Sequence, residues 1–257
     1  MNNYVKAPFI ALGYHRSGTS LLAGLMRCCG IHMGDKLYGP LASNEKGHFE
    51  EMNMLHFQRM LLRSICGSDG GIDICPTPDD VARKWQHTSA LAAVHKGFPH
   101  LSNEPPENIP WGWKDPRTLV FIRKWTEIFP DARYITVIRH PASVAESLRR
   151  RDNQSYVRVM DSWYRFHLNL IELISLNRTA IFVYDRLVDD PRLLGNFFKS
   201  RLSTGDMLGL DPTESDMEKC TQLVDPNLRH IKSPGNVLTS AASQIWEILK
   251  ARAIQYI

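Results

Sequence analysis

A polar, glycine-containing segment near the start of the chain has the residue types and spacing of an oxyanion-binding loop. Residues 13–20 read GYHRSGTS and lie between a short apolar run and a helical pattern. Glycines allow backbone N–H groups to turn inward, and the N-terminus of the following helix directs unpaired N–H groups and its positive dipole end at the same point. Arg16 and the neighbouring hydroxyls add side-chain donors. The segment predicts a phosphate-like ligand, and a turn with a simple Ser or Thr cap is the alternative.

The loop departs from the nucleoside-triphosphate pattern at one position. Its spacing is that of G-x-x-x-x-G-K-[ST], but Thr19 stands where the lysine belongs. Because a triphosphate needs that cation and a Mg²⁺ ion, the loop favours a nucleotide with fewer anionic groups at its 5′ end. A P-loop kinase or NTPase using Mg-ATP is the alternative, since the apolar run 180–184 is followed by Asp185, which could hold Mg²⁺.

A second anion site is indicated further along the chain. Arg139 directly follows the apolar run Tyr134–Ile138, and Ser147 comes eight residues after it. In a doubly wound sheet the carboxyl ends of neighbouring strands face one crevice, so we expect Arg139 to project toward the same cleft as residues 13–20. That cleft would hold two separated anionic groups. The alternative is an arginine in a strand-end salt bridge and a serine on an amphipathic helix.

Alternating apolar runs and helical patterns are expected to position these residues. Runs 7–12, 134–138 and 180–184 predict strands. The helical patterns that follow them extend from Ser20 to Gly30, through Val144 and Leu148, and over 193–202. This alternation is typical of the α/β class, with a central parallel sheet covered by helices on both faces.

The rest of the chain predicts further helices within one domain. Residues 38–110 have few strand signals and predict a helical insert, with a helix over 57–65 and a helix start at 76–80. Another helix is predicted over 152–174. Since domains average about 150 residues, a chain of 257 residues indicates a single domain over 1–257 that includes this insert.

Composition narrows the class of protein. The chain is 43% hydrophobic and 23% charged, which is typical of a globular protein and excludes fibrous and disordered classes. Its net charge of +4 is too small for a nucleic-acid coat, although it permits a local basic pocket. Apolar runs fall short of the roughly 20 residues of a membrane span, and no secretory signal is indicated. Five cysteines without a CxxC pair favour reduced thiols in a cytoplasmic protein.

With these segments together, the sequence resembles the PAPS-dependent sulfotransferases, whose donor is 3′-phosphoadenosine 5′-phosphosulfate (PAPS). The family's 5′-phosphosulfate loop reads P-[KR]-[ST]-G-T-[ST], and residues 15–20 match it with His in place of Pro. Its 3′-phosphate element is a strand-end Arg with a Ser eight residues on, as at Arg139 and Ser147. Residues 114–117 (KDPR) and 184–187 (YDRL), with 190–191 (DP), are similar to bacterial and tyrosylprotein-type members. The resemblance implies a three-layer P-loop-like α/β fold.

The resemblance also implies a set of donor-binding residues. The loop residues would hold the 5′-phosphosulfate, Arg139 and Ser147 would hold the 3′-phosphate, and Tyr184 would contact the adenine side. A late basic loop of the family often closes over the donor, and Arg229 stands at that place without the family's R-K-G pattern. The full set is His15, Arg16, Ser17, Gly18, Thr19, Ser20, Arg139, Ser147, Tyr184 and Arg229.

The reaction implied is metal-independent, in-line transfer of a sulfuryl group to a hydroxyl or amine, releasing adenosine 3′,5′-bisphosphate. Arg16 would stabilise the leaving oxygen, with Lys114 as a second cation. Residues 44–51 (NEKGHFEE) resemble a bacterial N-x-x-G-x-[FY]-E segment that supplies the base, so Glu50 is the first candidate, ahead of His48 and Asp115. A helix-cap role is the alternative for Glu50.

The acceptor is not determined by these residues, and carbohydrate, lipid and small-molecule hydroxyls all stay open. A non-catalytic nucleotide-binding module is a further alternative to an enzyme.

Two other clusters have simpler interpretations. The tryptophans in Trp111–Trp113 are expected in the core. The run Arg149–Arg151 is expected to be a solvated helix end, which could also guide an anionic donor.

Overall fold

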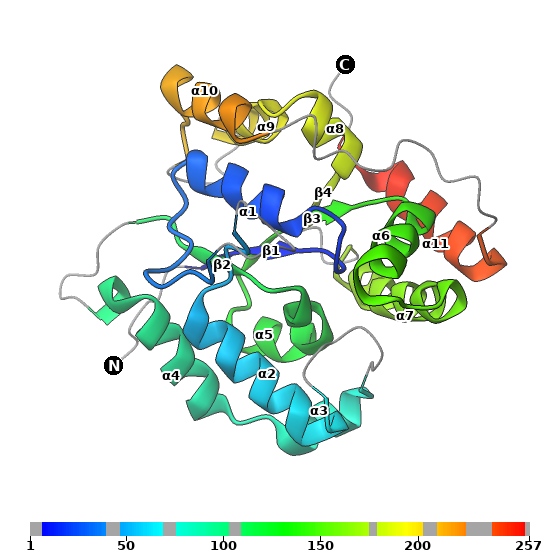
Figure 1. Cartoon of the computed structure of the whole chain (residues 1–257). Coiled ribbons are helices and arrows are strands. Elements are labelled where there is room, and N and C mark those ends of the chain that lie inside the picture. The colour runs from blue at the N-terminus through cyan, green and yellow to red at the C-terminus, as the bar shows by residue number, and fades with distance from the viewer. Residues whose placement is uncertain are drawn as a thin grey trace.

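A parallel sheet of four short strands forms the centre of the computed structural model, which describes residues 7–39, 47–68, 76–102, 109–174, 179–202, 210–224 and 238–254. The strand order is β2-β1-β3-β4, and every neighbouring pair is parallel (Figure 1). The strands are β1 (Phe9–Leu12), β2 (Gly112–Lys114), β3 (Arg133–Ile138) and β4 (Thr179–Val183). All four carboxyl ends therefore lie at one edge of the sheet, as predicted for the three strands over 7–12, 134–138 and 180–184.

Strand residues alternate between two hydrophobic clusters, one on each face of the sheet. Phe9 and Ala11 of β1 pack with α1 (Thr19–Cys28) and α9 (Leu193–Leu202), whereas Ile10 and Leu12 pack into the opposite cluster. The first face also carries α8 (Tyr184–Asp189) and α10 (Glu214–Leu223). The opposite face is covered by α2 (Met52–Cys66), α5 (Ile122–Ile128), α6 (Pro141–Asp152), α7 (Tyr156–Ile174) and α11 (Ser240–Arg252). Figure 1 shows these layers, which confirm the predicted three-layer α/β fold.

The segment between β1 and β2 is helical where it is described. Besides α2 it contains α3 (Pro78–Lys84) and α4 (His87–Gly97), followed by a 3-10 turn at Pro99–Ser102. Helix α3 begins where the sequence predicted, because Thr77 and Asp80 form a reciprocal capping box around Pro78. Trp111 and Trp113 are fully buried beside this segment, as expected. A second 3-10 turn, Pro116–Phe121, leads from β2 into α5.

Several boundaries differ from the sequence-based prediction. The predicted helix over 152–174 is the end of α6 and all of α7, since Asn153 has a left-handed backbone (φ 52°) that ends α6. The strand predicted over 180–184 is β4, which ends at Val183, so Tyr184 and Asp185 lie in the first turn of α8. The sequence analysis missed β2, α5, α8, α10 and α11. Among the described helices, none is long and apolar enough to cross a membrane.

Candidate active site

The predicted phosphate-binding loop connects β1 to α1, and its backbone forms a concave turn. Gly18 has a left-handed backbone (φ +94°), and a Cβ atom there would lie 2.2 Å from a ring carbon of Tyr184. Arg16 is also left-handed, at φ 64°, a conformation that costs a non-glycine residue energy and that often marks functional sites. The Ser17 hydroxyl is buried without a hydrogen-bond partner in the described part of the chain. The loop therefore presents a buried polar atom that a bound oxyanion would satisfy.

Arg139, at the end of β3, contacts this loop directly. Its Nη1 donates a hydrogen bond to the Arg16 carbonyl oxygen at 3.2 Å, and its guanidinium carbon lies 4.4 Å from the centre of the Tyr184 ring. The Arg16 Nε in turn donates to the Ser147 hydroxyl of α6 at 3.0 Å. Burial and the charges of Arg151 and Arg139 lower the pKa of Arg16. Positive charge from separate strand ends is thus concentrated around one loop.

On the β2 side of the loop, Glu50 and Lys114 form a buried ion pair. The Lys114 Nζ donates to Glu50 Oε1 at 2.8 Å, and the two side chains are only 2% and 9% exposed. Glu50 precedes α2, but the carboxylate that caps this helix belongs to Glu51, which accepts from the backbone N–H groups of Asn53 and Met54. The helix-cap alternative for Glu50 is therefore wrong. Its carboxylate is directed to the end of β2 instead.

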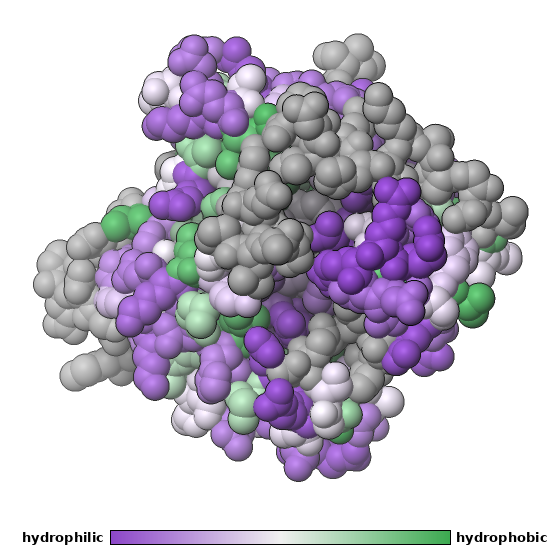
Figure 2. Space-filling view, viewed as in Figure 1, coloured by the Kyte–Doolittle hydropathy of each residue, from purple (hydrophilic) through white to green (hydrophobic). Residues whose placement is uncertain are grey.

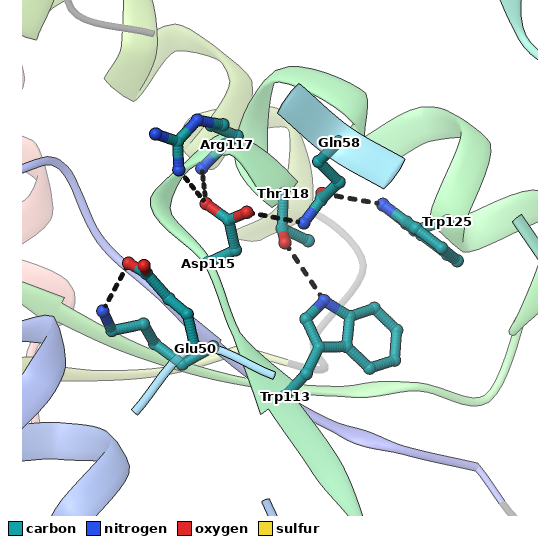
Figure 3. A network of polar contacts seen from close by, with 8 residues as sticks. Glu50, Gln58, Trp113, Asp115, Arg117, Thr118 and Trp125 are labelled. Carbon is teal, nitrogen blue, oxygen red and sulfur yellow. Dashed lines mark hydrogen bonds and ion pairs between the residues drawn. The ribbon is translucent and has the colours of Figure 1, made fainter. Parts of the chain in front are cut away.

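Asp115, directly after Lys114, is held in a second buried network. Its Oδ1 accepts from the backbone N–H and the Nη1 of Arg117, each at 2.9 Å, and its Oδ2 accepts from Gln58 Nε2 at 3.0 Å. Gln58 also accepts from the Trp125 ring N–H at 3.2 Å. Figure 3 shows these contacts, with Glu50 to one side. Burial raises the pKa of Asp115, the nearby Glu50 charge raises it further, and Arg117 opposes the rise.

Two histidines flank the loop, and each has a buried Nε2 without a hydrogen-bond partner among the described residues. They are His15 in the loop and His48, whose carbonyl oxygen accepts from the Ser20 hydroxyl at 3.3 Å. Burial lowers the pKa of His48 to about 4, with Lys114 and Arg151 contributing. Burial likewise lowers the pKa of His15 well below its ordinary value. Both imidazoles are therefore neutral at neutral pH.

The structure brings most predicted site residues together and reveals others. Thr19 and Ser20 begin α1 directly behind the loop, and Arg229 lies outside the described residues. The sequence analysis did not single out Gln58, and for Arg151 it suggested only that the run Arg149–Arg151 could guide an anionic donor. Arg151 lies one helical turn beyond Ser147, a spacing that could have identified it. The described side chains contain no group of three His, Cys, Asp or Glu that could hold a metal ion.

The match to a known family covers this whole arrangement. A model described as "Sulfotransferase family" matches residues 8–193, which include the loop, Glu50, Lys114, Arg139 and Tyr184. The chain belongs to the sulfotransferase family. The predicted resemblance is therefore confirmed, and membership supports sulfuryl transfer as the general activity. No curated protein matches the sequence.

Solved sulfotransferase structures share the fold. The sulfotransferase domain of the curacin biosynthetic pathway aligns with a TM-score of 0.57 and 17% identity, over 96% of this chain and 98% of that one. The sulfotransferase domain of the Synechococcus PCC 7002 olefin synthase gives 0.55 and 21%, over 95% and 94%. Sulfotransferase STF1 of Mycobacterium tuberculosis H37Rv gives 0.56 and 14%, over 96% and 77%. At these identities the likeness establishes the P-loop-like fold alone.

Proposed function

We propose that this sulfotransferase takes a sulfuryl group from PAPS and transfers it to a hydroxyl or amine of an acceptor, without a metal ion. One observation carries the choice of donor. Arg139 and Ser147, the expected 3′-phosphate ligands, both contact Arg16 of the expected 5′-phosphosulfate loop. One site then offers two adjoining anion cradles, which suits a nucleotide with charged groups on both sides of its ribose.

The donor fits the residues that surround these cradles. The buried, unpartnered Ser17 hydroxyl suits close approach of the 5′-phosphosulfate to the loop, and Gly18 leaves the space beside the loop backbone that the Tyr184 ring fills. Thr19, Ser20 and His15 complete that side, while Tyr184, stacked on Arg139, contacts the adenine side. Arg229 is proposed as a further donor ligand from the sequence resemblance alone.

The reaction is an in-line displacement at sulfur. The acceptor oxygen or nitrogen forms a bond to sulfur while the bond from sulfur to the bridging oxygen of the donor breaks, and its electron pair goes to that oxygen. Arg16 stabilises the negative charge that develops there, with the Lys114 ammonium as the second cation. Glu50 takes the proton of the acceptor, because its ion pair with Lys114 presents a charged carboxylate at the loop.

Glu50 suits the role of base better than Asp115. Both carboxylate oxygens of Asp115 already accept hydrogen bonds, and its side chain is 1% exposed. His48 is the second candidate, because its imidazole is neutral and its Nε2 has no hydrogen-bond partner among the described residues. The location of the enzyme is proposed from its thiols, since the cysteines Cys28, Cys29, Cys66 and Cys220 are free, as is typical of cytoplasmic proteins. A bacterial origin is proposed from the sequence resemblance to bacterial members of the family.

Turnover with labelled PAPS tests this proposal. The chain is incubated with labelled PAPS and a mixture of hydroxylated metabolites, with and without EDTA, beside an Arg16→Ala variant and a surface control, Arg123→Ala. We expect label in an acceptor product, unaffected by EDTA, with little label from the Arg16→Ala variant and normal transfer by Arg123→Ala. Transfer from Mg-ATP in place of PAPS would favour the kinase alternative, and donor binding without turnover would favour a non-catalytic module.

A further inference from the structure

The loop between β1 and α1 contains a tyrosine that makes none of the proposed donor contacts. Tyr14 lies two residues after the end of β1 and is fully buried. Its ring meets Phe166 of α7 edge-on, with 5.1 Å between the ring centres, and the centre of the His167 ring lies 6.2 Å away. Its hydroxyl donates a hydrogen bond to the Ser162 hydroxyl, also on α7, at 3.0 Å. The side chain of Tyr14 therefore attaches the loop to α7.

The backbone of Tyr14 begins a tight turn within the loop. Its carbonyl oxygen accepts a hydrogen bond from the Ser17 N–H at 3.1 Å, which closes a four-residue turn. Arg16 is the third residue of this turn and has a positive φ of 64°, at a position where glycine or asparagine is usual. A non-glycine residue in this conformation costs energy and persists only where the surrounding structure holds it. The turn therefore depends on contacts outside itself.

Two neighbouring helices supply such contacts. Tyr14 bonds to Ser162 of α7. Arg16 bonds to Ser147 of α6 through its Nε. Helices α6 and α7 pack against each other and cover the same face of the sheet (Figure 1). The first and third residues of the turn are thus tied to one pair of helices, and the fourth, Ser17, carries a buried hydroxyl without a hydrogen-bond partner in the described part of the chain.

The outer surface of α6 is polar. Figure 2 shows a strongly hydrophilic surface over this helix. Arg149, Arg150 and Arg151 are exposed at its end, which confirms the sequence-based interpretation of Arg149–Arg151 as a solvated helix end. Helix α6 thus presents these arginines to solvent and Ser147 to the loop.

We propose that Tyr14 is a positioning residue for the donor. Its hydrogen bond to Ser162 fixes the loop on α7, so that Arg16 and the Ser17 hydroxyl stand where the 5′-phosphosulfate binds. A loop that is already held in its binding conformation loses less conformational entropy when the ligand binds, so it binds more tightly. The inference rests on the proposed function and extends it to a buried residue that acts through the loop and does not touch the donor.

The effect should be confined to the 5′ side of the donor. Arg139 directly follows β3, and its guanidinium carbon lies 4.4 Å from the centre of the Tyr184 ring, so its place does not depend on the Tyr14 hydroxyl. Ser147, the other expected 3′-phosphate ligand, is fixed within α6. Loss of the Tyr14 hydroxyl should therefore weaken nucleotides through their 5′-phosphate and leave recognition of a 3′-phosphate almost unchanged.

Calorimetry with three nucleotides tests this inference. Adenosine 3′,5′-bisphosphate, AMP, which has the 5′-phosphate alone, and adenosine 3′-monophosphate are titrated into the wild type, Tyr14→Phe and Ser162→Ala. Each variant should bind the bisphosphate and AMP about three- to tenfold more weakly than the wild type, as expected for one neutral hydrogen bond. Adenosine 3′-monophosphate should bind within about twofold of the wild type. The double variant should lose no more than either single variant, because both changes remove the same bond.

A second buried tyrosine provides the matched control. Tyr134, the second residue of β3, is 1% exposed, and its hydroxyl forms a 3.0 Å hydrogen bond with the Thr126 hydroxyl of α5. It lies near the start of β3, whereas Arg139 contacts the loop from the other end of the strand. Tyr134→Phe should therefore lower the melting temperature, as Tyr14→Phe does, and leave the affinity for all three nucleotides unchanged.

A Tyr14→Phe protein that binds the bisphosphate and AMP as tightly as the wild type would overturn the inference. Equal weakening of adenosine 3′-monophosphate, or equal weakening by Tyr134→Phe, would also overturn it, since the change would then act on the whole fold. Losses that add in the double variant would mean that the bond itself is not the cause. A wild type that binds none of the nucleotides would end both proposals. Failure of the proposed function alone is seen when the wild type binds the bisphosphate no better than AMP, while AMP still reports on Tyr14.

Discussion

At the ends of β1 and β3, Arg16 and Arg139 hydrogen-bond to neutral oxygens, those of the Ser147 hydroxyl and of the loop backbone, whereas at the end of β2 Lys114 and Arg117 bond to carboxylates. A neutral partner orients a guanidinium and leaves its charge in place. A buried carboxylate offsets the charge and fixes the geometry of both groups. The first side is thus suited to binding a multiply charged nucleotide, and the second to holding a base and its neighbours in position.

Glu50→Gln tests the β2 side and carries the largest expected effect. The amide keeps the shape of the side chain and cannot take a proton, so turnover should fall about 10²- to 10⁴-fold. Affinity for adenosine 3′,5′-bisphosphate should stay close to that of the wild type, since the 3′ and 5′ cradles are intact. Steady-state turnover and calorimetry on the same preparation measure both. A Glu50→Gln enzyme with full turnover would remove Glu50 as the base.

Arg139→Ala tests the other side. Loss of a charged donor should weaken adenosine 3′,5′-bisphosphate by about 10- to 100-fold, because hydrogen bonds to charged groups contribute roughly 1.5–3 kcal/mol. AMP, which lacks the 3′-phosphate, should bind almost as before. Arg133→Ala, at the opposite end of the same strand, is the matched control. Equal weakening of both nucleotides by Arg139→Ala would contradict the 3′-phosphate assignment.

Asp115→Asn tests the β2 side through the free energy of unfolding. Removing the charge that offsets Arg117 in a buried network should lower the free energy of unfolding by about 1–3 kcal/mol, which shifts the melting temperature by roughly 2–4 °C per kcal/mol. Asp161→Asn, in an exposed pair with Arg165 on α7, should change stability by less than about 1 kcal/mol. Differential scanning calorimetry compares the two. Equal, small effects would mean that the Asp115 network contributes little to the fold.

Acid pH has the smallest expected effect on the free energy of unfolding. It acts through the buried imidazole of His167, whose pKa shift has no contribution from the arginines and lysines of the site. Burial lowers the pKa of His167 to about 4. Between that value and the unfolded pKa of about 6.5, the unfolded chain binds more protons than the folded chain. The protonation of His167 therefore takes nothing from the free energy of unfolding above about pH 6.5, and it lowers that free energy as the pH falls from 6.5 toward 4. Urea unfolding at pH 7 and pH 5 should show a smaller loss for His167→Phe than for the wild type, and equal losses would refute this.

The sequence predicted most of the loop side of the site because its chemistry lies at strand ends. Glycines and hydroxyls after one apolar run, and Arg139 after another, are local signals, and parallel strands bring such ends together. Strand β2 escaped detection because it has three residues, one of them glycine, between aromatic side chains that also suit a core turn. Its place at the sheet edge depends on pairing with β1, more than a hundred residues earlier in the chain.

The remaining contacts depend on tertiary packing that no local pattern encodes. Gln58 contacts Asp115, 57 positions away in the sequence, because α2 packs against the 3-10 turn that follows β2. Arg151 reads as one of three equivalent arginines until the orientation of α6 is known. Glu50 and Glu51 are adjacent in the sequence, yet only Glu50 pairs with Lys114, whereas Glu51 caps α2. Phe49, directly before Glu50, has a left-handed backbone.

The most direct measurement compares how strongly adenosine 3′,5′-bisphosphate, AMP and Mg-ATP stabilise the wild-type protein. At a concentration a hundredfold above its Kd, a ligand that binds only the folded state adds about 2.7 kcal/mol to the unfolding free energy. We predict the largest melting-temperature shift for the bisphosphate at equal concentrations, and a Kd at least about tenfold below that of AMP. Equal shifts with AMP, or a larger shift with Mg-ATP, would contradict the two-cradle account.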